Sequence, residues 1–294
     1  MLEIINFFEN ISSVQRSAIL IFGITFFWSI ELIIPLFKFN YKKFRHAIPN
    51  FFFTATTIIV NFSLAFLLLF SADWVTNNDF GLLNFFEIPI IIKVFLGVFL
   101  LDLIGAYLPH YVQHKINFLW KIHLVHHSDH NVDTTTANRH HPFESLIRFI
   151  FTLFGVIILG TSIGIVFLYQ SISLILSQFN HANIKLPSSI DKILSFVIVS
   201  PNMHKVHHHY VLPYTDSNYG NVFIFWDKLF GTFKELPVDK IKYGLIHYFL
   251  PFLREHQNRP AQNQLSYSSF FVLSHTPISS YQRPVTRFTS PLSW

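Results

Sequence analysis

Residues 149–180 read FIFTLFGVIILGTSIGIVFLYQSISLILSQFN and contain no charged side chain. A helix needs about 20 apolar residues to cross the hydrocarbon core of a bilayer, so this run is too long for one ordinary crossing. Gly160 and Gly164 lie at its middle, where a Gly-rich stretch favours a turn. We therefore expect a hairpin of two short membrane helices that reverses near Gly160. A single long, tilted helix is the alternative.

Three shorter, largely apolar runs, each long enough for one crossing, precede this segment at residues 17–37, 47–72 and 88–108. Only 13% of the residues are charged, against about 25% in a typical soluble chain, so too little polar surface is present to cover these runs in a water-soluble protein. The sequence therefore predicts an all-α integral membrane bundle with about four spans, the last pair as a helical hairpin, and a histidine-rich helical cap.

The basic residues predict the orientation of this bundle. The loop after the first run contains Lys38, Lys42, Lys43 and Arg45. The loop after the second run contains only acidic charges, at Asp73, Asp79 and Glu87. Because cytoplasmic loops are enriched in Lys and Arg, we expect the first loop, and with it the histidines from His110 onward, on the cytoplasmic side.

The chain divides into three parts on this interpretation. Residues 1–109 form the N-terminal transmembrane helices, and residues 110–257 form a histidine-rich catalytic region that includes the hairpin at 149–180. Residues 258–294 are rich in Ser, Thr, Pro and Gln and predict a disordered tail. The net charge of +5 is too small to indicate nucleic-acid binding, the absence of Cys excludes disulfides and thiolate sites, and the N-terminus lacks the pattern of a signal peptide.

Histidine is the most informative residue type in the chain. Its 17 copies concentrate in two windows with three spaced motifs: His110 and His114; His123, His126 and His127; and His204, His207 and His208. Residues three and four apart share one face of a helix, so each motif directs several imidazoles to one place. This pattern predicts metal binding, and a pH sensor built from histidines is the alternative.

Eight imidazoles exceed the number that one ion binds, so two metals with four or five histidines each fit the count. Imidazole suits zinc as well as iron, and the residue types leave both metals open. The predicted place of the cluster, against the cytoplasmic membrane face, suits oxidation of a C–H bond in a lipid that reaches the metals from the bilayer.

The order of these motifs resembles the fatty acid hydroxylase and sterol desaturase superfamily of membrane-bound histidine-box di-iron oxidases. Four other segments are similar to that family: RHHPFE at 139–144, HAN at 181–183, DSNYG at 216–220 and WDKLFGT at 226–232. The resemblance covers about residues 90–233 by motif. It implies an enzyme that uses O2 and two electrons to hydroxylate or desaturate a lipid of the sterol or fatty acyl type.

Carried over residue by residue, the resemblance implies nine metal ligands for two iron ions, with zinc as a substitute: His110, His114, His123, His126, His127, His181, His204, His207 and His208. Some relatives carry a further histidine where this chain has Lys185, and water, His141 or Asn183 are candidates for that role. His130, His140 and His209 lie outside the pattern and are expected to be neighbours.

Ligating imidazoles usually donate their second N–H to a carboxylate or carbonyl group. Candidates for this role are Asp102, Asp129, Asp133, Glu144, Asn183 and Asp216. The chain has no GxGxxG motif and no haem motif, so the resemblance implies a separate electron donor, either cytochrome b5-like or a ferredoxin.

Two other functions remain as alternatives. A zinc-dependent membrane hydrolase would carry HExxH, whereas the residues between the paired histidines here are Tyr-Val-Gln, Leu-Val and Lys-Val. A histidine-rich metal transporter or sensor would place ionisable residues along its spans to form a path, and the spans contain few.

Overall fold

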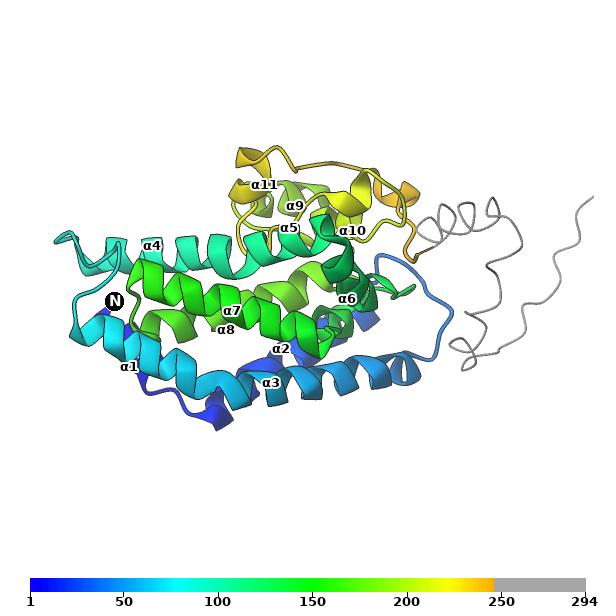
Figure 1. Ribbon diagram of the computed structural model, residues 1–294. Coiled ribbons are helices and arrows are strands. Elements are labelled where there is room, and N and C mark those ends of the chain that lie inside the picture. The colour runs from blue at the N-terminus through cyan, green and yellow to red at the C-terminus, as the bar shows by residue number, and fades with distance from the viewer. Residues whose placement is uncertain (246–294) are drawn as a thin grey trace, which may run out of the picture. The chain divides into compact units, whose positions relative to one another are not determined.

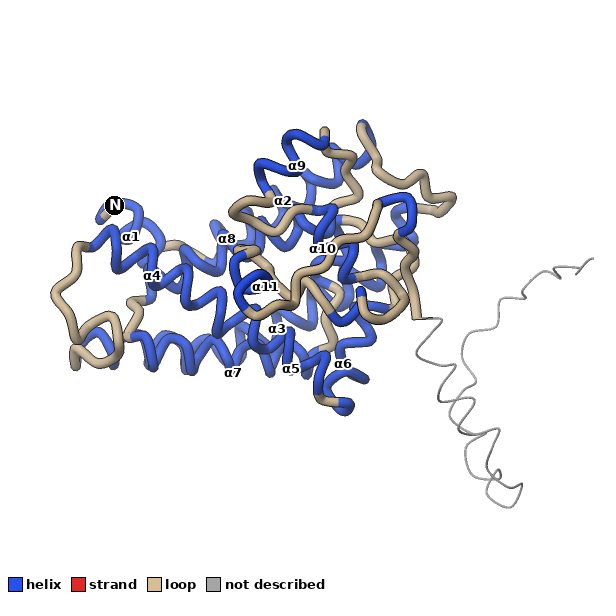
Figure 2. Tube along the Cα trace, turned by 90° about the horizontal axis from the view of Figure 1, so that it is seen from above, coloured by secondary structure: helices blue, strands red, loops and turns tan. Residues whose placement is uncertain are grey.

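The computed structural model describes residues 1–245, and five long helices form its frame (Figure 1). These are α2 Ser13–Ile33, α3 Lys43–Asn77, α4 Ile90–Asp102, α7 Pro142–Leu159 and α8 Ile163–His181. Within residues 1–245 the structure has helices, loops and isolated bridges but no strand (Figure 2). The all-α fold is therefore confirmed. The predicted tail at 258–294 lies outside the described residues.

Shorter helices follow or connect the long ones. In chain order they are α1 Leu2–Glu9, the π-helix η1 Leu103–Tyr107, α5 Leu108–Lys115, α6 Asn117–His127, η2 Thr134–Asn138, α9 Ser188–Leu194, α10 Pro201–His207, η3 Tyr214–Asp216, α11 Phe225–Leu229 and η4 Val238–Lys240. Helices α5, α6 and α10 carry eight of the nine predicted ligands on or immediately after them, at one end of the long helices (Figure 1).

The hairpin expected at residues 149–180 is present and reverses at Gly160. This residue follows α7 with φ 72° and ψ 41°, the left-handed conformation that glycine adopts without strain. The backbone of the loop before α4 covers the turn, because the N–H groups of Leu82 and Leu83 donate to the carbonyls of Ile158 and Leu159 at 2.9 Å each. The two arms have 18 and 19 residues.

The number of possible crossings is therefore higher than the sequence indicated. Five helices are long and apolar enough to cross a membrane, by length and composition, against about four expected. The difference arises at the hairpin, where we expected short arms. Helix α7 begins already at Pro142, before the uncharged run, because Pro in the first helical turn needs no hydrogen-bond partner for its nitrogen.

We expect Gly160→Ala to destabilise the protein by more than the left-handed backbone alone explains. A Cβ at this position would lie 2.1 Å from the carbonyl oxygen of Phe80, a backbone atom that cannot move alone. Gly231→Ala is the matched control, because Gly231 has φ +68° and open space around it. That control should lower the free energy of unfolding by about 1–2 kcal/mol. Thermal unfolding in detergent compares the two, and equal losses would contradict the packing argument.

The third span continues further than the sequence indicated. We expected it to end at residue 108, yet α4, η1 and α5 form one continuous apolar span, Ile90–Lys115. The helix continues through Pro109, which lies just after the π-helix η1, where the backbone hydrogen bonds depart from the α pattern. His110 and His114 therefore lie on the last turns of a membrane helix, which fixes their position relative to the bundle.

Small residues let the long helices approach closely. A Cβ at Gly155 on α7 would touch Leu101 and Ile104 at 3.2 and 3.3 Å, and one at Gly97 on α4 would meet Ile165 at 2.8 Å. Close backbone contact of this kind is a usual basis of helix association in membranes. The outer faces carry large exposed apolar side chains such as Phe62, 77% exposed, which suits contact with lipid.

Glu31 joins four segments at the end of the bundle that holds the histidines. Its carboxylate, 3% exposed, pairs with Lys43 at 2.7 Å and accepts from the backbone N–H groups of Thr134 at 2.7 Å and Asn183 at 2.8 Å. These contacts bring together the end of α2, the start of α3, the loop after α6 and the residues just after His181. A charge within an apolar run is thus fully compensated.

Candidate metal centre

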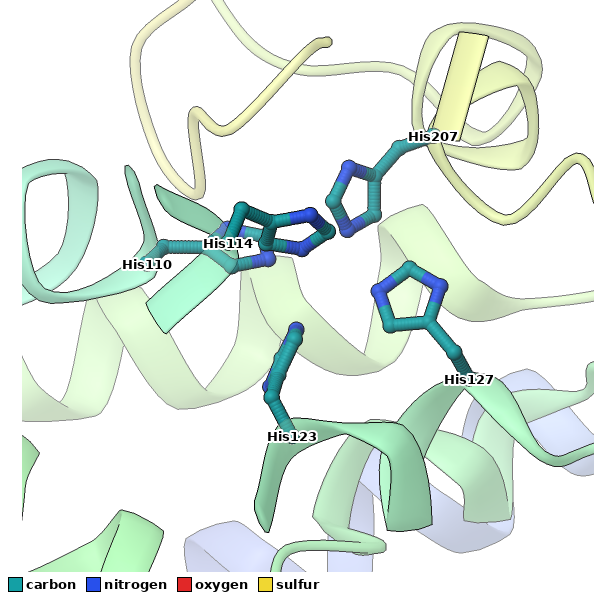
Figure 3. Close-up of side chains that lie close together, drawn as sticks. All are labelled: His110, His114, His123, His127 and His207. Atoms are coloured by element: carbon teal, nitrogen blue, oxygen red, sulfur yellow. The ribbon is translucent and has the colours of Figure 1, made fainter. Parts of the chain in front are cut away.

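The nine histidines that the sequence singled out lie together in two buried groups. The five-histidine group contains His110, His114, His123, His127 and His207. The four-histidine group contains His126, His181, His204 and His208. In each group, one nitrogen from every member lies within 4.8 Å of the others. Figure 3 shows the five imidazoles of the first group directed toward one another from three separate elements.

Helices α6 and α10 each supply both groups. On α6, His123 and His127 are four residues apart and face the five-histidine group, whereas His126 faces the four-histidine group. At α10, His207 faces the first group, and His204 and His208, again four apart, face the second. The i, i+4 spacing explains which members share a site. Each pair of consecutive histidines is divided between the two groups.

His181 occupies the middle of the four-histidine group. Its Nε2 lies 3.1 Å from Nε2 of His126 and 3.0 Å from Nε2 of His204. Its Nδ1 lies 2.7 Å from the carbonyl oxygen of Ser177, which can only accept, so Nδ1 carries the proton and Nε2 is an acceptor. Three imidazole nitrogens that converge in this way cannot satisfy one another completely. A cation between them would.

Backbone carbonyls orient two members of the five-histidine group. Nδ1 of His110 donates to the carbonyl of Tyr219 at 2.8 Å, and Nδ1 of His207 donates to that of Ser217 at 2.7 Å. The Nε2 atoms of both residues are buried and have no hydrogen-bond partner within residues 1–245. Because buried polar atoms are normally paired, these orphaned acceptors fit a site for a metal ion, with the second-nitrogen contacts that ligating imidazoles usually make.

The surroundings keep five of these imidazoles neutral. Burial, and then the neighbouring imidazoles, hold the pKa of His126, His127, His204 and His208 well below the usual value. The pKa of His207 is lowered in the same way. Neutral imidazole is the form that binds metals, so the donor set is ready at pH 7. The residues present therefore fit two metal ions, one with up to five and one with up to four nitrogen ligands.

Glu144, at the start of α7, contacts the five-histidine group directly. Its Oε1 lies 3.0 Å from Nδ1 of His123 and 3.1 Å from Nε of Arg148. The carboxylate is 0% exposed. The carboxylate lies beside Nδ1 and leaves Nε2 of His123 to face the group, the relation that orients many metal-binding histidines.

Asp216 and Asn183 have less direct contacts. Asp216 Oδ1 lies 3.9 Å from Nδ1 of His114 and accepts from the hydroxyl of Tyr219. Asn183 contacts no imidazole among the described residues, and its side chain instead bonds both backbone groups of Phe37, at 2.9 and 2.8 Å.

Asp102, within the third span, also contacts a different partner from the one expected. It accepts from the N–H groups of Val222 and Phe223 at 3.2 and 3.1 Å and from the indole of Trp226 at 3.2 Å, and not from an imidazole. It thereby fixes the loop 217–223 against the bundle. This loop supplies the carbonyls that orient His110 and His207, so Asp102 acts on the site through the backbone.

Two residues that the sequence did not assign hold the four-histidine group in place. Lys205, 0% exposed, donates from Nζ to the carbonyl of Ala182 and so ties α10 to the residue after His181. Glu31 accepts from the N–H of Asn183 one residue further on. The only signal in the sequence is a charge placed where the neighbouring pattern is apolar or histidine.

His140 and His209, which lie outside the three motifs, also lie outside both groups. The ring of His140 lies 5.0 Å from that of His126, and its Nε2 is 3.7 Å from Glu144. His209 accepts from the N–H of Lys242 at 3.0 Å.

A further histidine, His46 on α3, lies beside the two carboxylates that follow the second motif. Its Nε2 lies 2.7 Å from Asp129 and its Nδ1 lies 3.3 Å from Asp133. No spacing pattern marks His46.

We expect Asp129→Asn to destabilise the protein at neutral pH and to lose that effect in acid. Burial alone would raise the pKa of Asp129, but hydrogen bonds from His46, Asn131 and Thr136 outweigh it and lower the pKa from 3.8 to about 2. Since the folded pKa is the lower one, the stabilisation is complete above the unfolded value of 3.8 and disappears as the pH falls toward about 2. Its ceiling is about 2 kcal/mol.

Thermal unfolding of the wild type and Asp129→Asn over a series of pH values measures this difference. Exposed Asp239 supplies the control, because Asp239→Asn should leave the curve unchanged. A difference between wild type and Asp129→Asn that stayed constant down to the lowest pH would contradict the assignment.

Comparison with known proteins shows which family the segment with the histidines resembles. Residues 94–232 match the family model for fatty acid hydroxylase, and this segment contains all nine histidines. The ornithine lipid hydroxylase OlsE of Rhizobium tropici is 26% identical over 149 residues, 51% of this chain and 44% of OlsE. The human alkylglycerol monooxygenase is 32% identical over 145 residues, 49% of this chain and 31% of that protein.

Methylsterol monooxygenase 1-3 of Arabidopsis thaliana is 24% identical over 210 residues, 70% of either chain. The chain thus spans less than half of the length of OlsE and of alkylglycerol monooxygenase. No solved structure matches it.

Proposed function

We propose that this chain is a membrane-bound oxidase, because residues 94–232 match the family model for fatty acid hydroxylase. It uses O2 and two electrons to hydroxylate or desaturate a C–H bond of a lipid. The observation that carries the proposal is the division of nine buried imidazoles into two groups whose nitrogens converge. Two iron ions are the proposed cofactor, and the nine histidines are the proposed ligands.

The bound metals supply the activation of O2 and the oxidation of the C–H bond. The residues of the chain supply the rest. Carbonyls and Glu144 hold the imidazoles in one tautomer, and burial of the groups excludes water. The outer faces of the long helices are apolar. The lipid substrate therefore stays in the bilayer as it moves along them to the end of the bundle that holds the histidines.

We place the histidine groups on the cytoplasmic side. The basic loop at 38–43 lies at the same end of the bundle as the histidines, since Phe37 bonds Asn183 and Lys43 pairs with Glu31 next to His181. The basic loop and the metal centre therefore face the same side of the membrane. The positive-inside rule assigns it to the cytoplasm.

The relatives suggest three substrate classes to test. Their names specify an ornithine lipid, an alkylglycerol and a methylsterol. All three named substrates are lipids, which suits delivery from a bilayer. The electrons come from a separate carrier, either cytochrome b5-like or a ferredoxin.

Metal analysis of the detergent-purified protein tests the proposal first, followed by lipid profiling of cells with and without the protein. We expect about two irons per chain after iron-replete expression and one lipid class with an added hydroxyl group or double bond. Two zincs under the same conditions would favour a hydrolase instead. The absence of stoichiometric metal would overturn the oxidase and leave the family fold alone.

A further inference from the structure

Among the residues that the structure describes, Trp120 is a partly exposed aromatic side chain in direct ring contact with the five-histidine group. The indole of Trp120, on the first turn of α6, lies with its centre 4.6 Å from the ring of His114 and 5.2 Å from that of His127. It lies 6.0 Å from the ring of His123. Trp120 is partly exposed, whereas these imidazoles are buried. A carrier that touches the protein surface can therefore contact Trp120 but not the ligands.

A second aromatic route is longer. Tyr111, 36% exposed, contacts Tyr219 at 5.4 Å between ring centres, and Tyr219 contacts His114 at 5.1 Å. This path needs two ring contacts where Trp120 needs one. Since electron tunnelling weakens steeply with each added gap, Trp120 offers the better coupling to the group.

The corner between α5 and α6, which lies just before Trp120 in the chain, suits a protein partner of negative charge. The corner between α5 and α6 presents Ile116, 49% exposed, and Phe118, 70% exposed. Lys115 and Lys121 flank them and are exposed, and residues 103–128 contain no Asp or Glu. Lys115 is paired with Asp216, so Lys121 is the less compensated charge. An apolar centre with a basic rim is a usual form of a protein docking site.

We propose that Trp120 is the point at which electrons enter the metal centre, and that the α5–α6 corner (Lys115, Ile116, Phe118 and Lys121) docks an acidic one-electron carrier protein. This inference rests on the proposed function. Hydroxylation of one C–H bond consumes one O2, two electrons and two protons and releases one water. Two reduced carriers each lose one electron per turnover, and the indole itself is neither oxidised nor reduced overall.

Anaerobic stopped-flow reduction of the iron-loaded protein tests the role of Trp120. The probe is the prereduced soluble haem domain of cytochrome b5, an acidic one-electron carrier, and its haem absorbance reports each transfer. At saturating carrier, Trp120→Leu should slow the limiting first-order rate severalfold, with iron content unchanged. Trp120→Phe keeps an aromatic ring and should retain most of the rate. Tyr111→Leu, which interrupts the longer route, should leave the rate close to that of the wild type.

Charge reversal tests the docking surface separately. Lys121→Glu should raise the carrier concentration at half-saturation by about tenfold at low ionic strength, with the limiting rate unchanged. Added salt should remove most of this difference because the charges are exposed. Lys192→Glu is the matched control, since Lys192 is an exposed lysine on α9, away from the corner, and it should have no such effect.

The outcomes separate this inference from the function on which it rests. If the wild type binds two irons and accepts electrons, but Trp120→Leu matches it, the electrons enter elsewhere and the inference is wrong. Equal effects of Lys121→Glu and Lys192→Glu would show that overall charge, and not this corner, attracts the carrier. If Lys121→Glu and Phe118→Ser instead weaken binding to lipid vesicles, the corner contacts the membrane. A wild type without iron would overturn the proposed function itself.

Discussion

Replacing His181 with alanine will remove one of the two metals and reduce lipid oxidation to background. Its Nε2 lies within 3.1 Å of two other members of the four-histidine group, so no member is more central. Loss of one ligand from four leaves three nitrogens around the ion. Changes to residues that merely support ligands cost about 10–100-fold in metal affinity, and loss of this ligand should exceed that range.

Metal content measures the result directly. We expect about one iron per chain in His181→Ala, with the five-histidine group still loaded, against about two in the wild type. His209→Ala is the matched control, because His209 follows the third motif but belongs to neither group and bonds the backbone of Lys242. Two irons retained in His181→Ala would show that His181 is not a ligand.

Replacing Glu144 will have the second largest effect, and the size will depend on the substituent. Glu144→Gln keeps the shape but removes the charge that His123 and Arg148 face at 3.0 and 3.1 Å. We expect a loss of about 10–100-fold in metal affinity of the five-histidine group, the usual result when a supporting carboxylate is removed. Glu144→Ala also leaves Arg148 without its partner and should cost about 3–5 kcal/mol of stability.

Iron titration and thermal unfolding of the two variants separate these effects. Glu235→Gln, at an exposed position, controls for the loss of a carboxylate as such. Equal iron affinity in the wild type and Glu144→Gln would mean that the contact with His123 does not support metal binding. The carboxylate would then be a structural ion pair only.

The membrane bundle was predictable because hydrophobicity and glycine act locally. The charge-free run at 149–180 and the glycine at 160 specified a hairpin, and the turn lies at that glycine. The ends of the helices were less predictable. Helices α5 and α7 extend into polar sequence, where neighbouring elements and a proline in the first turn, and not apolar composition, decide the boundary.

The histidines of the candidate site were easier to predict than the residues that hold them in place. The histidines of the three motifs could be predicted to bind two metals, but each motif was expected to direct its imidazoles to one place. The structure instead divides the second and third motifs between the two groups, with members four residues apart in the same group. Asp102 accepts from the N–H of Val222, Glu31 accepts from that of Asn183, and Lys205 donates to the carbonyl of Ala182, and these partners lie 120, 152 and 23 residues away in the chain. No local pattern can specify such contacts. Proximity in sequence suggested that Asp102 faces an imidazole, whereas the folded chain brings residues 222–226 to it.

The division of each consecutive histidine pair has a consequence for how the centre can vary. Consecutive residues on a helix point about 100° apart, so one turn of α6 and one turn of α10 serve both sites. A one-residue insertion within either turn would misdirect ligands of both sites at once. The two sites therefore change together when either helix changes. A metal bound at one site also holds α6 and α10 in the positions that the other site needs.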